Sequence, residues 1–214
     1  MAAKYSVVIA LGVLAIANAQ LQSVNGRIKI TTGTTSGCGD TVNFITNQLA
    51  DAYEEYKQFL DIEFVPWGRT VRNDDGSLSC QFGENDCFAN RLHRCVLDKL
   101  RGNQQAQMDY MRCEFSTPYP AYLLRSYQCA AAAGLDLVNI DICVATPLGD
   151  HLDTAAQAAA AEPMQVINFV PSIVFNDQID ISLHTEARTR LKSMICFALA
   201  ADPTTGPIKP SISY

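Results

Sequence analysis

The sequence predicts an α/β fold in which a small sheet is interrupted by a helical, disulfide-stapled insertion. Residues 26–32 and 62–67 have the character of two strands, and the residues between them follow a helical pattern. A strand pattern and a long helical pattern return after residue 164. Residues 80–161 differ in kind, because they contain six of the eight cysteines and several helical stretches. One domain with a large insertion fits the length of 214 residues.

The first half predicts a strand, a helix and a second strand. Pro66 is expected to end the second strand. A helix is expected over residues 41–60, because apolar side chains recur at spacings of three and four, at Val42, Ile45, Leu49, Tyr53, Tyr56 and Leu60. Two strands joined by a helix should be parallel, with a right-handed crossover. Residues 72–77 are rich in turn residues and predict a loop.

The insertion is expected to contain helices at residues 90–101, 119–133 and 155–161. Its cysteines should form disulfides if the chain enters an oxidising compartment. The structural disulfide candidates are Cys80, Cys87, Cys95, Cys113, Cys129, Cys143 and Cys196. Because seven is odd, either one of them is free, or one pairs with Cys38, or a bond joins two chains. The C-x6-C-x7-C spacing of the first three lacks the C-x2-C pairs of a zinc site, so no metal is expected.

The last third predicts a return to the sheet. Alternation at residues 164–170 indicates a strand, and residues 170–181 indicate a β-hairpin that turns at Asn176–Asp177 and has Pro171 at its entrance. A helix is expected at residues 183–201. The complete order, βα-β, helical insertion, ββ-α, is that of a thioredoxin-like fold with an expanded central helix. Residues 20–201 would form this domain, and residues 202–214 a loose tail.

Residues 1–19 are expected to be a signal peptide. Lys4 precedes an uncharged apolar stretch, and Ala17-Asn18-Ala19 fits a cleavage site before Gln20. Loss of Lys4 would leave 15 basic against 22 acidic residues, a formal charge of −7. An acidic chain without a basic cluster predicts neither a nucleic-acid nor a membrane partner. The absence of any Asn-x-Ser/Thr sequence predicts that N-linked glycans do not direct its transport.

Cys38 is the candidate nucleophile. It lies in a turn between the first strand and the first helix, where free backbone N–H groups and the helix dipole favour a thiolate. A hydrogen bond from Thr41 would also stabilise the thiolate, whereas Asp40 would oppose it. The residues alone leave two interpretations open, a reactive thiol and a structural one. Thr41 occupies the position that would complete a C-x-x-C motif.

The segment from Cys80 to Cys95 resembles the motif C-Q-H-G-x-x-E-C-x-x-N-x-x-x-x-C of the gamma-interferon-inducible lysosomal thiol reductase family. The matching positions are Cys80, Gln81, Gly83, Cys87, Asn90 and Cys95. Phe82 stands where the family has His, and Asp86 where it has Glu. The resemblance extends over nearly the whole chain after residue 20, and Cys113, Cys129, Cys143 and Cys196 fall where the family has cysteines.

The resemblance implies a thioredoxin fold and the reduction of protein disulfides at acidic pH. It places Cys38 on the first active-site cysteine, Thr41 on the second, and Pro171 on the cis-proline that positions substrate. A C-x-x-T site needs an external thiol, such as cysteine or glutathione, and no other cofactor. The expected partners are disulfide-containing proteins. The alternative is an impaired, secreted relative that binds an extracellular protein, and the expected location is the lysosome or the exterior.

The three histidines, His93, His151 and His184, are scattered along the chain. We expect each of them to be a surface histidine or one with satisfied hydrogen bonds, rather than a metal ligand or a catalytic base.

Overall fold

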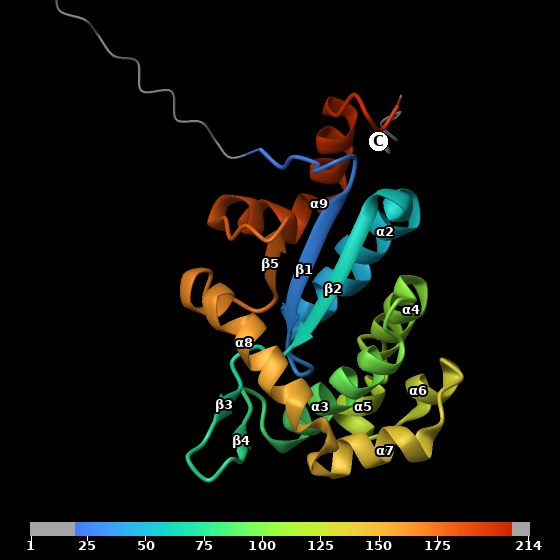
Figure 1. Cartoon of the computed structure of the whole chain (residues 1–214), viewed down its shortest axis with the longest axis vertical. Coiled ribbons are helices and arrows are strands. Elements are labelled where there is room, and N and C mark those ends of the chain that lie inside the picture. The colour runs from blue at the N-terminus through green and yellow to red at the C-terminus, as the bar shows by residue number, and fades with distance from the viewer. Residues whose placement is uncertain (1–19, 207–214) are drawn as a thin grey trace, which may run out of the picture.

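The computed structural model describes residues 20–206, which form a three-stranded sheet and a large helical insertion (Figure 1). The strands lie in the order β2-β1-β5. The central strand β1 (Ile28–Thr34) pairs in parallel with β2 (Leu60–Pro66), with Ile28 opposite Leu60. It pairs in antiparallel fashion with β5 (Ser172–Phe175). The predicted parallel arrangement of the first two strands is therefore correct.

The connection between β1 and β2 is one helical run built from four consecutive segments. These are α1 (Gly39–Asn43), the π-helical η1 (Phe44–Leu49), α2 (Ala50–Tyr56) and the 3₁₀ turn η2 (Lys57–Phe59). Its buried side chains include Phe44, Ile45, Leu49, Tyr53 and Tyr56, so the predicted apolar stripe does face the core. This run packs on the C-terminal helix α9 (Ile181–Ala201).

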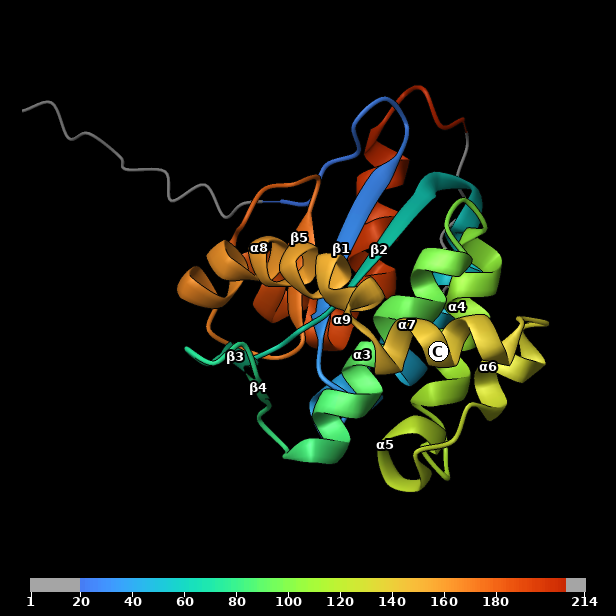
Figure 2. The same cartoon turned by 60° about the horizontal axis from the view of Figure 1, so that its bottom comes forward.

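The insertion consists of helices that lie beside and in front of the sheet (Figure 1 and Figure 2). They are α3 (Glu84–Lys99), α4 (Gln104–Glu114), α5 (Pro120–Leu124), α6 (Gln128–Ala132), α7 (Leu137–Ala145), the 3₁₀ turn η3 (Pro147–Gly149) and α8 (Asp150–Val166). The α8 helix contacts β2 and β5, and both views place it on the sheet face opposite to α9. The helix expected at residues 119–133 is instead two short helices, because Arg125 adopts a left-handed backbone with φ 49°.

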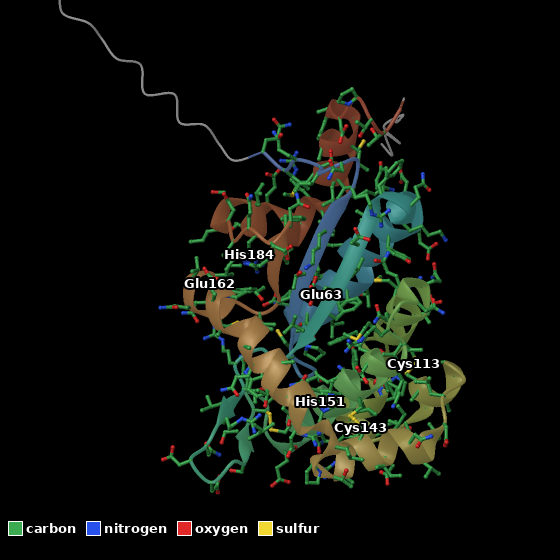
Figure 3. All side chains as sticks on the ribbon, in the orientation of Figure 1. Glu63, Cys113, Cys143, His151, Glu162 and His184 are labelled. Atoms are coloured by element: carbon green, nitrogen blue, oxygen red, sulfur yellow. A yellow bond between two sulfur atoms is a disulfide. The ribbon has the colours of Figure 1, made fainter. Side chains whose placement is uncertain are left out.

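Three disulfides tie this helical portion together. Cys95–Cys143 joins α3 to α7, Cys113–Cys129 joins α4 to α6, and Cys80–Cys87 closes a small ring at the start of α3. Figure 3 places Cys113 and Cys143 among these helices. Of the seven disulfide candidates, Cys196 is the one that is free, and its thiol is buried in α9, so the alternative of one free cysteine among the seven is the correct one. That helix packs on η1, α2 and β5, whereas the six paired cysteines lie within the insertion.

Two predicted strands do not form. Residues 164–170 do not form a strand, because α8 continues to Val166 and a short connection follows. The second hairpin strand is reduced to one bridge between Phe175 and Gln178. The reason is that Asp180 caps α9 early, its side chain accepting a hydrogen bond from the Leu183 N–H at 2.9 Å.

The loop predicted at residues 72–77 is the tip of a small hairpin, in which β3 (Val71–Arg72) pairs with β4 (Leu78–Ser79). At the other end of the described chain, Asp202 accepts hydrogen bonds from Ser23 and from the Gly26 N–H. The expected signal peptide lies outside the described residues, as does most of the expected tail. Between residues 20 and 206, no helix is long and apolar enough to cross a membrane.

Candidate functional site

Cys38 lies at the start of α1, directly after the turn that follows β1. Its side chain is 8% exposed, and its thiol donates to the backbone oxygen of Val170 at 3.5 Å. The Val170–Pro171 peptide bond is cis. The structure thus brings together Cys38 and the segment of Pro171, which are more than 130 residues apart in the sequence.

A cleft of about 460 Å³ opens in front of Cys38. It is lined by Cys38, Gly39, Asp40, Arg69, Gln81, Phe82, Phe169 and Val170. The guanidinium of Arg188 stacks on the ring of Phe169 at 3.8 Å and lies 4.0 Å from the Asp40 carboxylate. Arg69 donates to the backbone oxygen of Asn168 at 2.6 Å. The guanidinium of Arg188 therefore partly offsets the charge of Asp40, which the sequence alone suggested would oppose a thiolate.

Thr41 is fully buried one helical turn after Cys38. Its hydroxyl has no hydrogen-bond partner within the described part of the chain, so the hydrogen bond expected between Thr41 and Cys38 is not formed. A hydroxyl forms no disulfide, and the free thiols of the described residues are those of Cys38 and the buried Cys196. The site therefore contains one thiol at the cleft and no neighbouring thiol in the C-x-x-C position.

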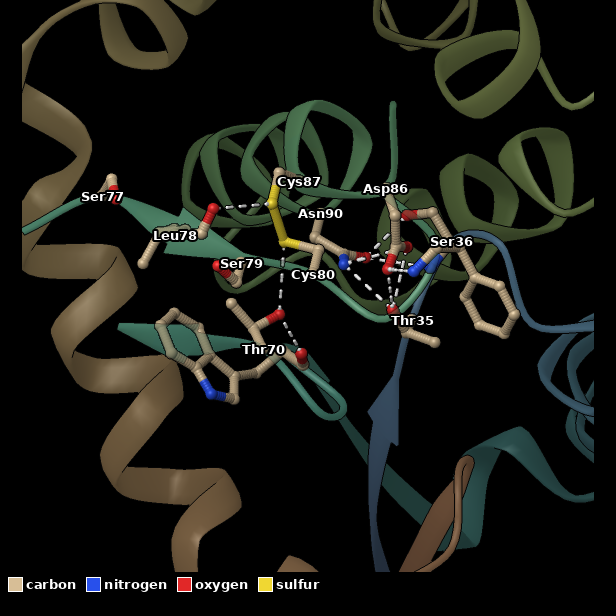
Figure 4. Close-up of a disulfide and its surroundings, with 12 residues drawn as sticks. Thr35, Ser36, Thr70, Ser77, Leu78, Ser79, Cys80, Asp86, Cys87 and Asn90 are labelled. Atoms are coloured by element: carbon tan, nitrogen blue, oxygen red, sulfur yellow. Dashed lines mark hydrogen bonds between the residues drawn. A yellow bond between two sulfur atoms is a disulfide. The ribbon is translucent and has the colours of Figure 1, made fainter. Parts of the chain in front are cut away.

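The segment from Cys80 to Cys95 packs directly on the turn that precedes Cys38 (Figure 4). A Cβ atom added to Gly37 would lie 2.6 Å from the Phe82 side chain, so only glycine fits there. Asp86 and Asn90 of α3 hydrogen-bond to Thr35, Ser36 and Gly37. Sequence reasoning found these residues as parts of a motif but not as neighbours of Cys38. Their i, i+4 spacing on one helix face was the available signal.

The buried His184 packs against the residues on both sides of the cis-proline. Its Nδ1 accepts a hydrogen bond from the Ile173 N–H at 3.3 Å, and its ring contacts Phe169. Burial, with a smaller contribution from Arg188, lowers the pKa of His184 to about 4. The imidazole is therefore neutral in the folded protein across mildly acidic pH.

This pKa predicts a loss of stability with acidification. In the unfolded chain His184 takes up a proton below its ordinary pKa of 6.5, whereas in the folded protein it does so only near 4. Its stabilising contribution is thus complete above about pH 6.5 and is lost as pH falls toward 4. Melting temperatures measured from pH 7 to pH 4.5 should fall less steeply for His184→Gln than for the wild type. Parallel curves would contradict the assignment.

The other two histidines differ from each other in their surroundings. His93 is buried, with its Nδ1 3.4 Å from the Ser36 hydroxyl and its Nε2 3.7 Å from the Glu114 carboxylate. His151 is exposed on α8 (Figure 3). Across residues 20–206, no group of three or more His, Cys, Asp or Glu side chains is arranged to hold a metal ion.

Three features together define a thioredoxin-like fold. The central strand has one parallel and one antiparallel neighbour, a cis-proline follows the helical insertion, and a cysteine stands at the start of the first helix. Residues 29–133 match the family described as gamma interferon inducible lysosomal thiol reductase (GILT). This match and the curated relatives described below support membership of this family. Membership and fold together support a function of the thiol reductase type.

Curated relatives match over most of the chain. GILT-like protein 1 of Drosophila melanogaster is 26% identical over 179 residues, which cover 77% of this chain and 72% of that protein. The gamma-interferon-inducible lysosomal thiol reductase-like protein of Anopheles gambiae is 24% identical over 182 residues, covering 78% and 74%. Among solved structures, a thioredoxin-like oxidoreductase from Silicibacter pomeroyi DSS-3 superimposes with a TM-score of 0.49 and 17% identity, covering 81% of this chain and 91% of that one.

Proposed function

We propose that this protein is a thiol–disulfide oxidoreductase that reduces protein disulfides through the single thiol of Cys38. The observation that carries the proposal is the position of this thiol. It is free, it lies at the first turn of a helix, and it faces the Val170 carbonyl beside cis-Pro171 at an open cleft. A helix start favours the thiolate, which is the nucleophilic form. The backbone of the Pro171 segment would pair with an extended peptide, as in strand addition.

The reaction begins when the Cys38 thiolate attacks one sulfur of a substrate disulfide. A bond forms between Cys38 and that sulfur, and the other substrate sulfur leaves as a thiolate and takes up a proton. With Thr41 in place of a resolving cysteine, the mixed disulfide persists until an external thiol attacks Cys38 Sγ and releases the second substrate thiol. A second external thiol then frees Cys38. One substrate disulfide is reduced, and two small thiols are oxidised to one disulfide.

The proposed setting is a compartment that is oxidising enough for structural disulfides and supplies a low-molecular-weight thiol, such as cysteine or glutathione. Three disulfides fit an extracellular or lysosomal lumen. The proposed signal sequence at residues 1–19 would deliver the chain to that route. Because the sequence has no Asn-x-Ser/Thr site, we favour secretion over transport by mannose-phosphate glycans.

A second candidate function is that of a secreted binding protein that retains the fold without turnover. Two observations favour it, the buried Thr41 at the resolving position and Phe82 at the family's histidine position. The cleft would then hold an extended segment of an extracellular protein without chemistry at Cys38.

The two functions are separated by trapping the mixed disulfide. The protein without residues 1–19 is incubated near pH 5 with a peptide dimer joined by one disulfide, quenched in acid and analysed by peptide mass spectrometry. The oxidoreductase proposal predicts one peptide added at Cys38, its removal by excess cysteine, and no adduct in Cys38→Ser. Absence of a Cys38 adduct, together with disulfide reduction no faster than the small thiol alone, would overturn it and favour the binding protein.

A further inference from the structure

We propose that Asp86 is a positioning residue for Cys38, because its buried carboxylate holds the turn Thr35–Gly37 that delivers the thiol to the cleft. This inference rests on the proposed function of Cys38 and assigns a role to a residue that does not itself reach the cleft. Asp86 belongs to the eight-residue ring that the Cys80–Cys87 disulfide closes. Figure 4 shows it pointing from α3 toward Thr35 and Ser36.

Four separate groups donate hydrogen bonds to the Asp86 carboxylate. The Thr35 hydroxyl lies 2.9 and 2.8 Å from its two oxygens, and the Gly37 N–H lies 3.1 Å from Oδ1. The Phe82 N–H donates to Oδ2 at 3.3 Å, and the Asn90 amide donates to Oδ1 at 3.1 Å. Every neighbour is a donor, so an acceptor-only group such as a carboxylate satisfies the whole set.

The burial of this carboxylate is the second step of the argument. Asp86 is completely inaccessible, and no ion pair connects it to a basic residue within the described chain. A buried carboxylate without a cation is costly unless hydrogen bonds compensate it fully. Here the compensating donors come from the turn before Cys38, from the Phe82 N–H in the disulfide ring, and from Asn90 on the same helix. The carboxylate therefore fixes the turn and the disulfide ring relative to each other.

Asn90, one helical turn further along α3, completes the attachment. Its Oδ1 accepts from the Ser36 N–H at 3.0 Å and from the Ser36 hydroxyl at 2.7 Å. Its Nδ2 donates to the Thr35 hydroxyl at 3.1 Å. All three residues of the turn are thus bonded to one face of α3, and the next residue in the chain is Cys38.

The attachment leaves the turn little freedom. Phe82 covers Gly37 so closely that no side chain fits there, and the Cys38 N–H bonds back to the Thr35 oxygen at 3.3 Å. Cys38 in turn donates to Val170. A shift of the turn would change the distance from Cys38 to the helix start and to the cis-proline segment together. Because displacements of about 1 Å reduce reaction rates by orders of magnitude, the turn must be held by rigid neighbours.

The test is the pH dependence of Cys38 alkylation by iodoacetamide, followed by peptide mass spectrometry, in Asp86→Asn. The amide nitrogen would face donors, which loosens the turn and removes Cys38 from its stabilising position. The expected result is a rise of the alkylation midpoint by about 1 pH unit and, because the thiolate fraction then falls about tenfold, an about tenfold slower reaction near pH 5. Asp86→Glu keeps an acceptor-only group, so its alkylation midpoint and its rate near pH 5 should lie between those of Asp86→Asn and the wild type.

The matched control is Asp153→Asn. Asp153 is almost as completely buried, and it pairs with Arg91 and Arg94 of α3 rather than with the turn Thr35–Gly37. It should lower the melting temperature and leave the Cys38 midpoint unchanged. If Asp86→Asn also lowers only the melting temperature, Asp86 is merely structural and the proposal is overturned. A lower midpoint would overturn it as well, since it would mean that the carboxylate acts by repelling the thiolate.

If Asp86→Asn does not fold, the Cys38 alkylation midpoint of Thr35→Val provides an independent test. This substitution removes the hydroxyl that bridges Asp86 and Asn90 while it keeps the side-chain shape. A raised Cys38 midpoint in this variant supports the proposal, and an unchanged midpoint overturns it. The alkylation assay measures the reactivity of the Cys38 thiol and does not depend on enzymatic turnover. A wild-type Cys38 that alkylates normally but never forms a mixed disulfide would contradict the proposed function alone.

Discussion

If Cys38 acts as proposed, Thr41→Cys is expected to add a resolving thiol and to give a dithiol reductase that no longer depends on external thiol. The new thiol would lie one helical turn from Cys38, in a position that is already buried and whose hydroxyl makes no hydrogen bond. It would attack Cys38 Sγ in the mixed disulfide as an intramolecular nucleophile, whose effective concentration far exceeds that of a small thiol. We expect release of the reduced substrate to become about 100-fold faster at low thiol concentration.

The measurement is single-turnover release of a reduced peptide from the Cys38 mixed disulfide, both without small thiol and at a low concentration of it. Thr41→Ser is the matched control, because it also changes the side chain at this position but cannot form a disulfide. It should release no more peptide than the wild type. If Thr41→Cys releases none either, other features of the site, such as Phe82 at the family's histidine position, prevent turnover.

The juxtaposition of Cys38 and Pro171 was predictable because it follows from the order of the elements. A strand followed by a helix places the intervening turn at the carboxyl end of β1, and an antiparallel partner of β1 must begin at that same end. The antiparallel pairing of Gly33 with Ser172 shows this directly. The expectation that Pro171 lies beside Cys38 came from the resemblance to the family, and the pairing of β1 with β5 gives its structural reason.

The bonds between α3 and the turn were not predictable from pattern, since they join residues about 50 positions apart. Nothing in the local sequence of Thr35, Ser36 and Gly37 indicates which buried group satisfies their donors. The same limit applies to Cys196. Parity required a free cysteine, a bond to Cys38 or a bond between chains, but only the packing of α9 shows that Cys196 is the free one.

The prediction of a second hairpin strand was wrong because of the residues immediately after the turn. Residues 178–181 alternate like a strand, yet Asp180 is a good helix cap and the residue after it starts α9. The left-handed residues Asn176 and Asp177 reverse the chain so tightly that one bridge suffices before the cap. Alternation over four residues was too short a signal to outweigh the capping of a 21-residue helix.

Removal of the Cys95–Cys143 disulfide should have the largest effect on stability. It closes the longest loop of the three, with a sequence separation of 48, against 16 for Cys113–Cys129 and 7 for Cys80–Cys87. The loop-entropy relation gives losses of about 4, 3 and 2.5 kcal/mol in that order. Paired Cys→Ala variants compared by urea unfolding should reproduce this ranking. Cys196→Ala is the control, because it removes a buried sulfur of similar size without opening a loop.

The Cys95–Cys143 disulfide is also expected to affect the site. Cys95 lies on α3, and the N-terminal part of this helix hydrogen-bonds to the Thr35–Gly37 turn before Cys38. If α3 transmits its position to Cys38, the double variant Cys95→Ala/Cys143→Ala should raise the Cys38 alkylation midpoint as well as lower the unfolding free energy. Cys113→Ala/Cys129→Ala, which loosens α4 and α6, should lower stability alone. Equal midpoints in both variants would mean that the first turns of α3 hold their place without this bridge. The Cys80–Cys87 ring would then be the remaining covalent support of the turn.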